Sequence, residues 1–123
     1  MPDHRNRIGI AGEEHALAHY LRLDFLVVER NARTRWGELD LIVVDATTLV
    51  FCEVRTRVHG RGDPLESFGP RKVRQVRRMA ANWLSTNKGP EAPRRPILRL
   101  DAAADLVTPD GELVELQVLE GAL

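Results

Sequence analysis

Apolar side chains recur at helical spacing between Gly9 and Leu23. They stand three, four or seven residues apart, which is the spacing along one face of an α-helix. The apolar positions are Ile10, Leu17, Tyr20 and Leu21. The segment therefore predicts an amphipathic helix with this face on the core. His15 and His19 are expected on the solvent side.

Further along the chain the apolar residues form short, strand-like runs. Segments 25–31, 38–44 and 49–55 are rich in Val, Leu, Ile and Phe, and each predicts a strand. Segments 97–107 and 113–119 are joined by the turn-like TPDGE and predict a closing strand pair.

Between these groups of strands the pattern returns to a helical period. Pro70 suits the first turn of a helix, because its φ is already close to the helical value. The buried stripe of this second helix is expected to be Val73, Val76, Ala80, Trp83 and Leu84. The pattern thus predicts two helices and five strands, which places the chain in the α/β class. Segment 58–69, with three Gly and one Pro, is expected to be a loop.

The hairpin formed by 38–44 and 49–55 has a register that can be predicted. If its turn lies between Ala46 and Thr47, facing residues have numbers that sum to 93, so Ile42 faces Phe51. Both faces of the pair are then apolar, which predicts burial on both sides. The same register places Asp40 opposite Glu53, and Glu38 opposite Arg55.

Facing carboxylates on paired strands repel each other and need compensation. A divalent cation can supply it, because Mg²⁺ commonly binds one or two carboxylates together with water and substrate phosphate. Arg55 adds a positive charge on the same face, so the cluster would suit a phosphodiester. The alternative is that these residues are solvated charges at a strand end, with Glu38 and Arg55 in an ordinary cross-strand pair.

Composition narrows the class of protein. The 123 residues are 43% hydrophobic and 29% charged, which predicts one folded domain over 1–123, with 1–8 and 120–123 flexible at its ends. No apolar run approaches the length of a membrane span, and the start lacks a signal-peptide core, so a cytoplasmic location is expected. Cys52, the single cysteine, is expected to be a small buried residue.

Several of these segments resemble the YraN-like family of bacterial proteins. The similar segments are GEE at 12–14, RNAR at 30–33, GELDLIVVD at 37–45, VFCEVRTR at 50–57 and the basic helix after Pro70. That family has a restriction-endonuclease-like fold and is related to Holliday-junction resolvases. The resemblance implies a mixed β-sheet flanked by helices. A homodimer is a further possibility, because the related resolvases act as dimers.

The resemblance also implies roles for individual residues. Asp40 and Glu53 correspond to the metal-binding acids of the PD-(D/E)xK nuclease motif, with Mg²⁺ or Mn²⁺ as the ion. Arg55 stands where the motif has lysine; it keeps the positive charge but cannot act as a base. Glu38 matches the family's GE-x-D pattern, and the family also has a lysine at Lys72.

Glu13 also matches the family pattern, and its position is informative. It projects within the apolar arc of the first helix and therefore needs a partner. It is either a further metal or water ligand, or a buried glutamate paired with an arginine such as Arg33.

The second helix carries five basic residues and no acid between positions 71 and 78. Lys72 lies at the edge of the apolar stripe and is expected near the acids. Arg71, Arg74 and Arg78 are expected on the exposed side, where a run of cations favours phosphate contact over a merely solvated face.

Three functions remain compatible with the sequence. The first is a metal-dependent nuclease acting on DNA, including branched or structured DNA. The second is a nucleic-acid-binding module that retains the fold without cleaving. The third is a protein-interaction adaptor whose basic helix meets an acidic partner. The acid pair favours the first, and arginine at position 55 favours the second more than lysine would.

Overall fold

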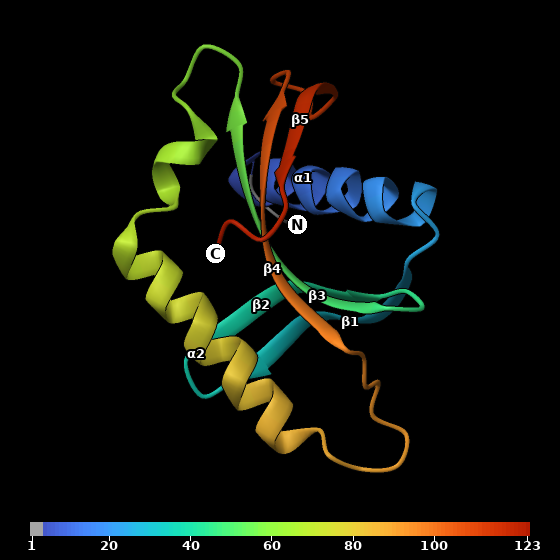
Figure 1. Ribbon diagram of the computed structural model, residues 1–123. Helices are drawn as coiled ribbons and strands as arrows, with labels where there is room; N and C mark the ends of the chain where they lie inside the picture. Colours follow the sequence, from blue (N-terminus) through green and yellow to red (C-terminus); the bar gives the residue numbers. More distant parts are fainter. Residues whose placement is uncertain (1–3) are drawn as a thin grey trace.

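The computed structural model describes residues 4–123, and the side chains from Asn6 onward. Its strands form one five-stranded mixed sheet in the order β1-β2-β3-β4-β5, with a helix on each face (Figure 1). The helices are α1 (His4–Arg22) and α2 (Pro70–Thr86), and the strands are β1 (Leu26–Thr34), β2 (Gly37–Val44), β3 (Thr48–Val58), β4 (Ile97–Val107) and β5 (Leu113–Leu119). The single-domain α/β class predicted from the periodicity is confirmed.

The strands of this sheet do not overlap along their whole length. β3 and β4 pair in parallel over eleven residues each, and the helix α2 connects them. β2 pairs only with the first part of β3, and β5 only with the second part of β4, both antiparallel. The second half of β3 therefore has no β2 neighbour on that side.

The register of the β2–β3 hairpin agrees with the prediction. Ile42 faces Phe51 and Leu41 faces Cys52, and both pairs are buried. Ile42 and Phe51 belong to the core beneath α2, where the ring centroids of Phe51 and Trp83 are 5.7 Å apart. Leu41 and Cys52 belong to the core beneath α1. The sheet is thus buried on both faces here, and Cys52 is the small buried residue that was expected.

The two helices match their predictions unequally. In α2 the predicted stripe packs on the core, joined by Met79, and the helix begins at Pro70 as expected. In α1 the predicted buried face is correct for Tyr20 and Leu17, which pack on the core, and wrong for Ile10 and Leu21, which are each about half exposed.

The face of α1 that meets the sheet has two small residues at its centre. It consists of Ile8, Gly12, Ala16 and Tyr20. A Cβ on Gly12 would overlap Thr56 Oγ1, so the helix approaches β3 through a position where no side chain fits. Hydrophobic periodicity gives such small residues little weight, which is why the sequence pattern selected a neighbouring face.

The ends and loops add three observations. Residues 4–8 lie in α1, residues 1–3 are outside the described part of the chain, and Leu123 is buried with its N–H bonded to Leu100 O. The predicted loop 58–69 contains a short 3₁₀ helix, Pro64–Ser67, with Asp63 as its cap. Within residues 4–123, neither α1 nor α2 combines the length and apolar character that a membrane-spanning helix requires.

Candidate active site

The two predicted acids meet where β2 separates from β3. Regular backbone pairing ends at Leu41 and Cys52. Beyond it, the Asp40 N–H donates to Glu53 Oε1 at 3.1 Å, and the Val54 N–H donates to Asp40 Oδ2 at 2.7 Å. Each carboxylate thus replaces a backbone carbonyl as acceptor. Asp40 and Glu53 are neighbours on adjacent antiparallel strands, but they are linked through side chains rather than as a backbone pair.

Glu53 is the most deeply buried carboxylate of this cluster. Only 1% of it is exposed, so its charge needs close partners. Lys72 Nζ lies 2.9 Å from Glu53 Oε2, and an Arg55 guanidinium nitrogen lies 3.7 Å from the same oxygen. One cation therefore comes from α2 and the other from β3 itself. Arg55 also donates to Val54 O at 3.0 Å, which fixes its guanidinium beside the acids.

The pKa of Asp40 is raised well above its usual value. Burial, reinforced by the negative charge of Glu53, raises the pKa of Asp40 to about 7, although the Val54 N–H opposes the shift. Burial also raises the pKa of Glu13 above its usual value, and the nearby Arg30 counters part of that rise. Near neutral pH, Asp40 therefore lies close to the midpoint between its charged and neutral forms.

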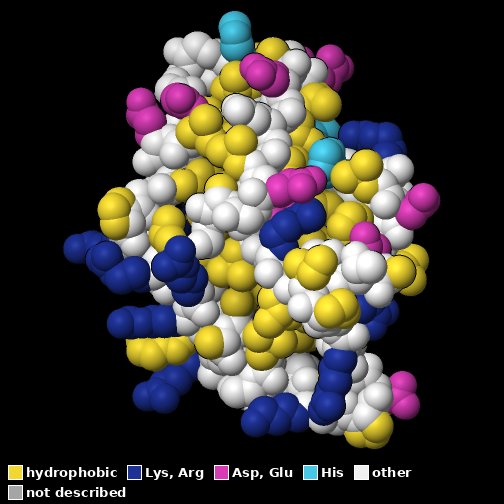
Figure 2. Space-filling view, viewed as in Figure 1, with side chains coloured by type: hydrophobic (Ala, Val, Ile, Leu, Met, Phe, Trp, Pro, Cys, Tyr) yellow, Lys and Arg dark blue, Asp and Glu magenta, His cyan; other side chains and the backbone are white. Residues whose placement is uncertain are grey.

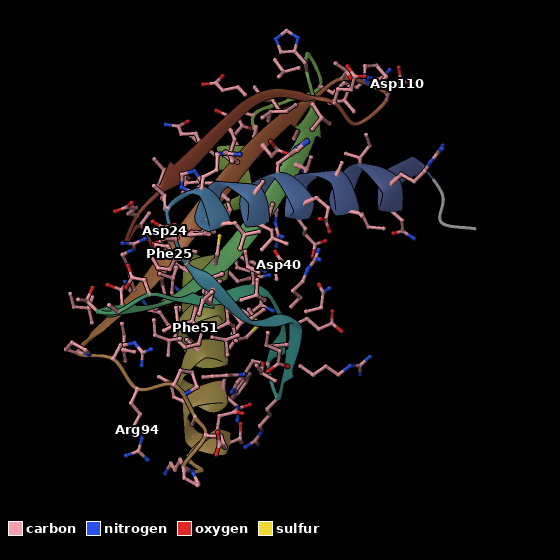
Figure 3. All side chains as sticks on the ribbon, turned by 90° about the vertical axis from the view of Figure 1, so that its right-hand side faces the viewer. Asp24, Phe25, Asp40, Phe51, Arg94 and Asp110 are labelled. Atoms are coloured by element: carbon pink, nitrogen blue, oxygen red, sulfur yellow. The ribbon has the colours of Figure 1, made fainter. Side chains whose placement is uncertain are left out.

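A cavity of about 1000 Å³ opens over Asp40, between α1 and the second half of β3. Glu13 contributes to the α1 wall, and Arg55 to the β3 wall. Figure 3 shows Asp40 close to α1 near the middle of the molecule. Glu53 does not line this cavity but lies buried beside Asp40. Asp40 and Arg55 therefore line the same cavity, and Glu53 lies behind Asp40.

Glu38 lies apart from this cluster, contrary to the register argument. The hairpin pairing does not reach it, so no Glu38–Arg55 pair forms on the β2–β3 ladder. Glu38 instead faces Arg33 on β1, with Arg33 Nε 3.5 Å from its carboxylate. Arg33 was the suggested partner for Glu13, but it pairs with Glu38 instead.

The donor set can be compared with what a divalent cation requires. No group of three His, Cys, Asp or Glu residues within 4–123 is arranged to hold a metal. Two carboxylates are nevertheless adjacent, and Mg²⁺ is commonly held by one or two carboxylates with water and phosphate completing the shell. Burial, and after it the negative charge of Glu53, raise the pKa of Asp40, although Lys72 and Arg55 lie beside Glu53. This donor set fits a hard cation bound through Asp40 and Glu53.

Comparison with known proteins identifies the family. Residues 12–104 match Uncharacterised protein family UPF0102. A UPF0102 protein of Mycolicibacterium smegmatis is 41% identical over 117 residues, which are 91% of each chain. One from Frankia alni is 39% identical over 119 residues, covering 96% of this chain and 95% of the relative.

The chain belongs to the UPF0102 family. Other matches are more local: with a UPF0102 protein of Acidothermus cellulolyticus, 46% identity extends over 82 residues, 66% of this chain and 62% of that protein. The matched segment 12–104 contains GELD, the E-x-basic segment and the basic helix, which agrees with the resemblance to YraN-like proteins. The acids and cations of the cluster therefore all lie in the part of the chain that defines the family.

The basic side of α2 is exposed as the helical pattern indicated. Arg71, Arg74 and Arg78 are exposed, whereas Lys72 is half-buried where it meets Glu53. Figure 2 shows Lys and Arg side chains projecting from the α2 side of the molecule. These arginines form a cationic surface next to the acid cluster.

The sequence reasoning missed two cations of the cavity. Arg57 and Arg61 line it together with Asp40. Arg57 is held by hydrogen bonds to Thr56 O and Ser67 Oγ. The run RTRVHGR, with a basic residue at every second position of an exposed strand end, is a signal that could have located them.

The expectation that His15 lies free on the solvent side is wrong. His15 Nδ1 lies 2.7 Å from Oδ2 of the fully buried Asp105 on β4. Burial raises the pKa of Asp105, and His15 counters part of that rise. Asp105 Oδ1 has no hydrogen-bond partner within the described residues. His19 is likewise only half exposed.

Proposed function

We propose that this UPF0102 protein is a metal-dependent nuclease that hydrolyses phosphodiester bonds in DNA, on a restriction-endonuclease-like fold. The observation that carries the proposal is the buried pair Asp40–Glu53, held at a strand separation beside a large cavity, with Lys72 and Arg55 on the same carboxylate. The order α1, β1, β2, β3, α2, β4, with only β3 and β4 parallel, supports the fold assignment.

The metal part of the proposal concerns Mg²⁺ or Mn²⁺. Asp40 and Glu53 would hold the ion, which when bound would lower the pKa of a water molecule and neutralise phosphate charge. Because burial raises the pKa of Asp40 to about 7, a cation would compete with a proton for this carboxylate, and metal binding should strengthen as pH rises through neutrality.

The remaining cations have distinct positions in the proposed reaction. Lys72 and Arg55 lie at Glu53, where positive charge would stabilise negative charge developing on the phosphate. Arg57 and Arg61 line the cavity, where they can pair with flanking phosphates. Because Lys72 reaches the acids from α2, the chain retains a lysine at the site although position 55 is arginine.

A cleavage assay tests the proposal. Purified protein with Mn²⁺ is incubated with linear, flapped and four-way DNA. Arg55→Lys should retain or increase cleavage, because it keeps the charge. Lys72→Ala and Arg55→Ala should each lower the rate on the order of a hundredfold, the loss typical of removing one preorganised stabiliser of charge. DNA affinity should change much less.

The control for contaminating nuclease is Asp40→Ala, which removes the proposed metal ligand. If wild type and Arg55→Lys bind DNA but cut none of the substrates above this control, the nuclease assignment fails. The second candidate, a non-catalytic nucleic-acid-binding module, would then replace it. That candidate is favoured by the direct Lys72–Glu53 ion pair, which already neutralises one of the two acids.

A further inference from the structure

An aromatic side chain is exposed at the turn between β1 and β2. Trp36 is 44% exposed, whereas Trp83 is almost fully buried. Packing against the core therefore does not account for the Trp36 ring. Two arginines approach it, with the Arg78 guanidinium carbon 4.9 Å and that of Arg35 5.6 Å from the ring centroid.

The turn that carries Trp36 is anchored to α2 through its backbone. Gln75 donates to Trp36 O at 2.9 Å, and the Arg35 N–H donates to Asn82 Oδ1 at 2.9 Å. Within the turn, the Trp36 N–H donates to Thr34 Oγ1 at 3.1 Å. The backbone is thus held in place while the indole ring remains open to solvent, which lowers the entropic cost of placing a ligand on it.

The two elements that hold Trp36, β2 and α2, also carry residues of the candidate site. Asp40 lies on β2, and Lys72 on α2 pairs with Glu53. Along β2, Asp40 is four residues away, or about 13 Å at ~3.3 Å per residue. Along α2, Arg78 is six residues from Lys72, or about 9 Å at ~1.5 Å per residue. These separations correspond to about three or four stacked nucleotides at ~3.4 Å each.

We infer that Trp36, flanked by Arg35 and Arg78, is a stacking platform for an unpaired base of a nucleic acid whose backbone lies along α2. Because the polymer is taken to be a nucleic acid, this inference rests on the proposed function and narrows its substrate to nucleic acid with single-stranded character near the site. Every base has a π-face, so such a platform is tolerant of sequence.

The arginines have a second role in this arrangement. Guanidinium planes stack on aromatic rings and also pair with phosphate. When a base takes one face of the indole, the arginine that it displaces is free to contact the adjacent phosphate. Arg71 and Arg74 continue the exposed cationic surface along the same helix.

The test compares two fluorescein-labelled probes of equal length and charge, an oligothymidylate and an abasic oligonucleotide. Anisotropy titrations are made in EDTA, so that no cleavage interferes. Wild type should bind oligothymidylate about tenfold more tightly than the abasic probe. Trp36→Ala should abolish this preference with little change in abasic binding, and Trp36→Phe should retain most of it.

Charge is controlled separately from stacking. Arg78→Gln should weaken binding of both probes, whereas Arg22→Gln, an equal charge change at the exposed end of α1, should change neither. Equal binding of both probes by wild type, no binding of either, or an equal loss for both in Trp36→Ala would overturn the inference. The inference would also be overturned if polyglutamate displaced oligothymidylate equally well from wild type and from Trp36→Ala, because the surface would then recognise acidic polymers by charge alone.

The outcome is distinguishable from that of the nuclease proposal. A base preference that depends on Trp36, without cleavage, would rule out the nuclease proposal and leave the stacking platform supported. Cleavage that depends on Asp40, without a base preference, would remove only the stacking platform.

Discussion

At the scale of single residues, Asp40 combines a structural and a chemical property. Its carboxylate accepts the Val54 N–H where β2 and β3 separate, so it satisfies a backbone group that β2 no longer pairs. The same residue carries a pKa of about 7 because it is buried beside Glu53. A side chain placed in this way contributes to the local fold at a cost in charge repulsion, which a cation would relieve.

The first residue-scale prediction concerns Asp40→Asn in the metal-free protein. Since the folded-state pKa lies above the ordinary value of 3.8, the folded state binds this proton more tightly than the unfolded state. The stability that this tighter proton binding contributes is therefore lost as pH rises from about 4 to about 7. Asn still offers a carbonyl to the Val54 N–H but does not ionise.

Urea unfolding of both proteins in EDTA across this pH range measures the effect. Asp40→Asn should match wild type near pH ~4 and exceed it by about 1 to 3 kcal/mol near pH ~8. A difference that does not vary with pH, or a variant less stable at high pH, would show that the Asp40 charge is not the cause.

At the scale of elements, the close approach of α1 to the sheet depends on a glycine as well as on buried apolar residues. Gly12 lies against Thr56, where a Cβ would overlap the side-chain hydroxyl. At Gly9, three residues earlier, a Cβ would point into open space, with no atom within 4 Å outside the helix backbone. The same substitution at these two sites should therefore have opposite effects.

Gly12→Ala should lower the free energy of unfolding by about 1 to 3 kcal/mol, because the helix must move away from the sheet. Gly9→Ala should raise it by up to about 1 kcal/mol through helix propensity alone. Denaturant unfolding of the two variants and wild type provides the measurement. Thr56→Ala should restore part of the loss in Gly12→Ala; two substitutions of equal effect would contradict close packing at Gly12.

The second element-scale prediction concerns the exposed side of α2. Replacing Arg71, Arg74 and Arg78 by Gln should weaken DNA binding and flatten the slope of log affinity against log salt by up to about 3, since each phosphate contact releases about one counterion. Mn²⁺ affinity should stay nearly unchanged. Filter binding at several salt concentrations measures the slope, and an unaltered slope would remove this helix from the interface.

At the scale of the whole molecule, another buried acid joins distant parts of the chain. Asp101 on β4 is fully buried and accepts hydrogen bonds from Tyr20 Oη on α1 at 2.6 Å and from the Gly121 N–H at 2.9 Å. Arg99 donates to both of its oxygens. These bonds join the first helix, the sheet and the C-terminal turn, so Asp101 has a structural role.

Tyr20→Phe tests this link because it removes one hydrogen bond and leaves the ring in place. The loss should be about 1 to 3 kcal/mol of unfolding free energy, the range for a hydrogen bond to a buried charged group. Leu21→Ala, at the adjacent and half-exposed position, should cost less. Equal losses in thermal or urea unfolding would mean that the Tyr20–Asp101 bond contributes little.

The sequence by itself determined the strands, the register of the β2–β3 hairpin and the stripe of α2. These features depend on local periodicity, which period-two and period-3.6 patterns record directly. It also brought Asp40 and Glu53 together, because four apolar pairs fix the alignment of two strands that are adjacent in the chain.

The tertiary structure decided what depends on separate elements meeting. The loss of β2 pairing beyond Leu41 kept Glu38 away from Arg55, and the close approach of α1 at Gly12 set its buried face. His15 pairs with Asp105, ninety positions away. The Trp36 backbone is hydrogen-bonded to α2, while its ring is 44% exposed beside Arg78. Such outcomes depend on long-range packing and on the competition of polar groups for partners, which residue spacing along one chain does not encode.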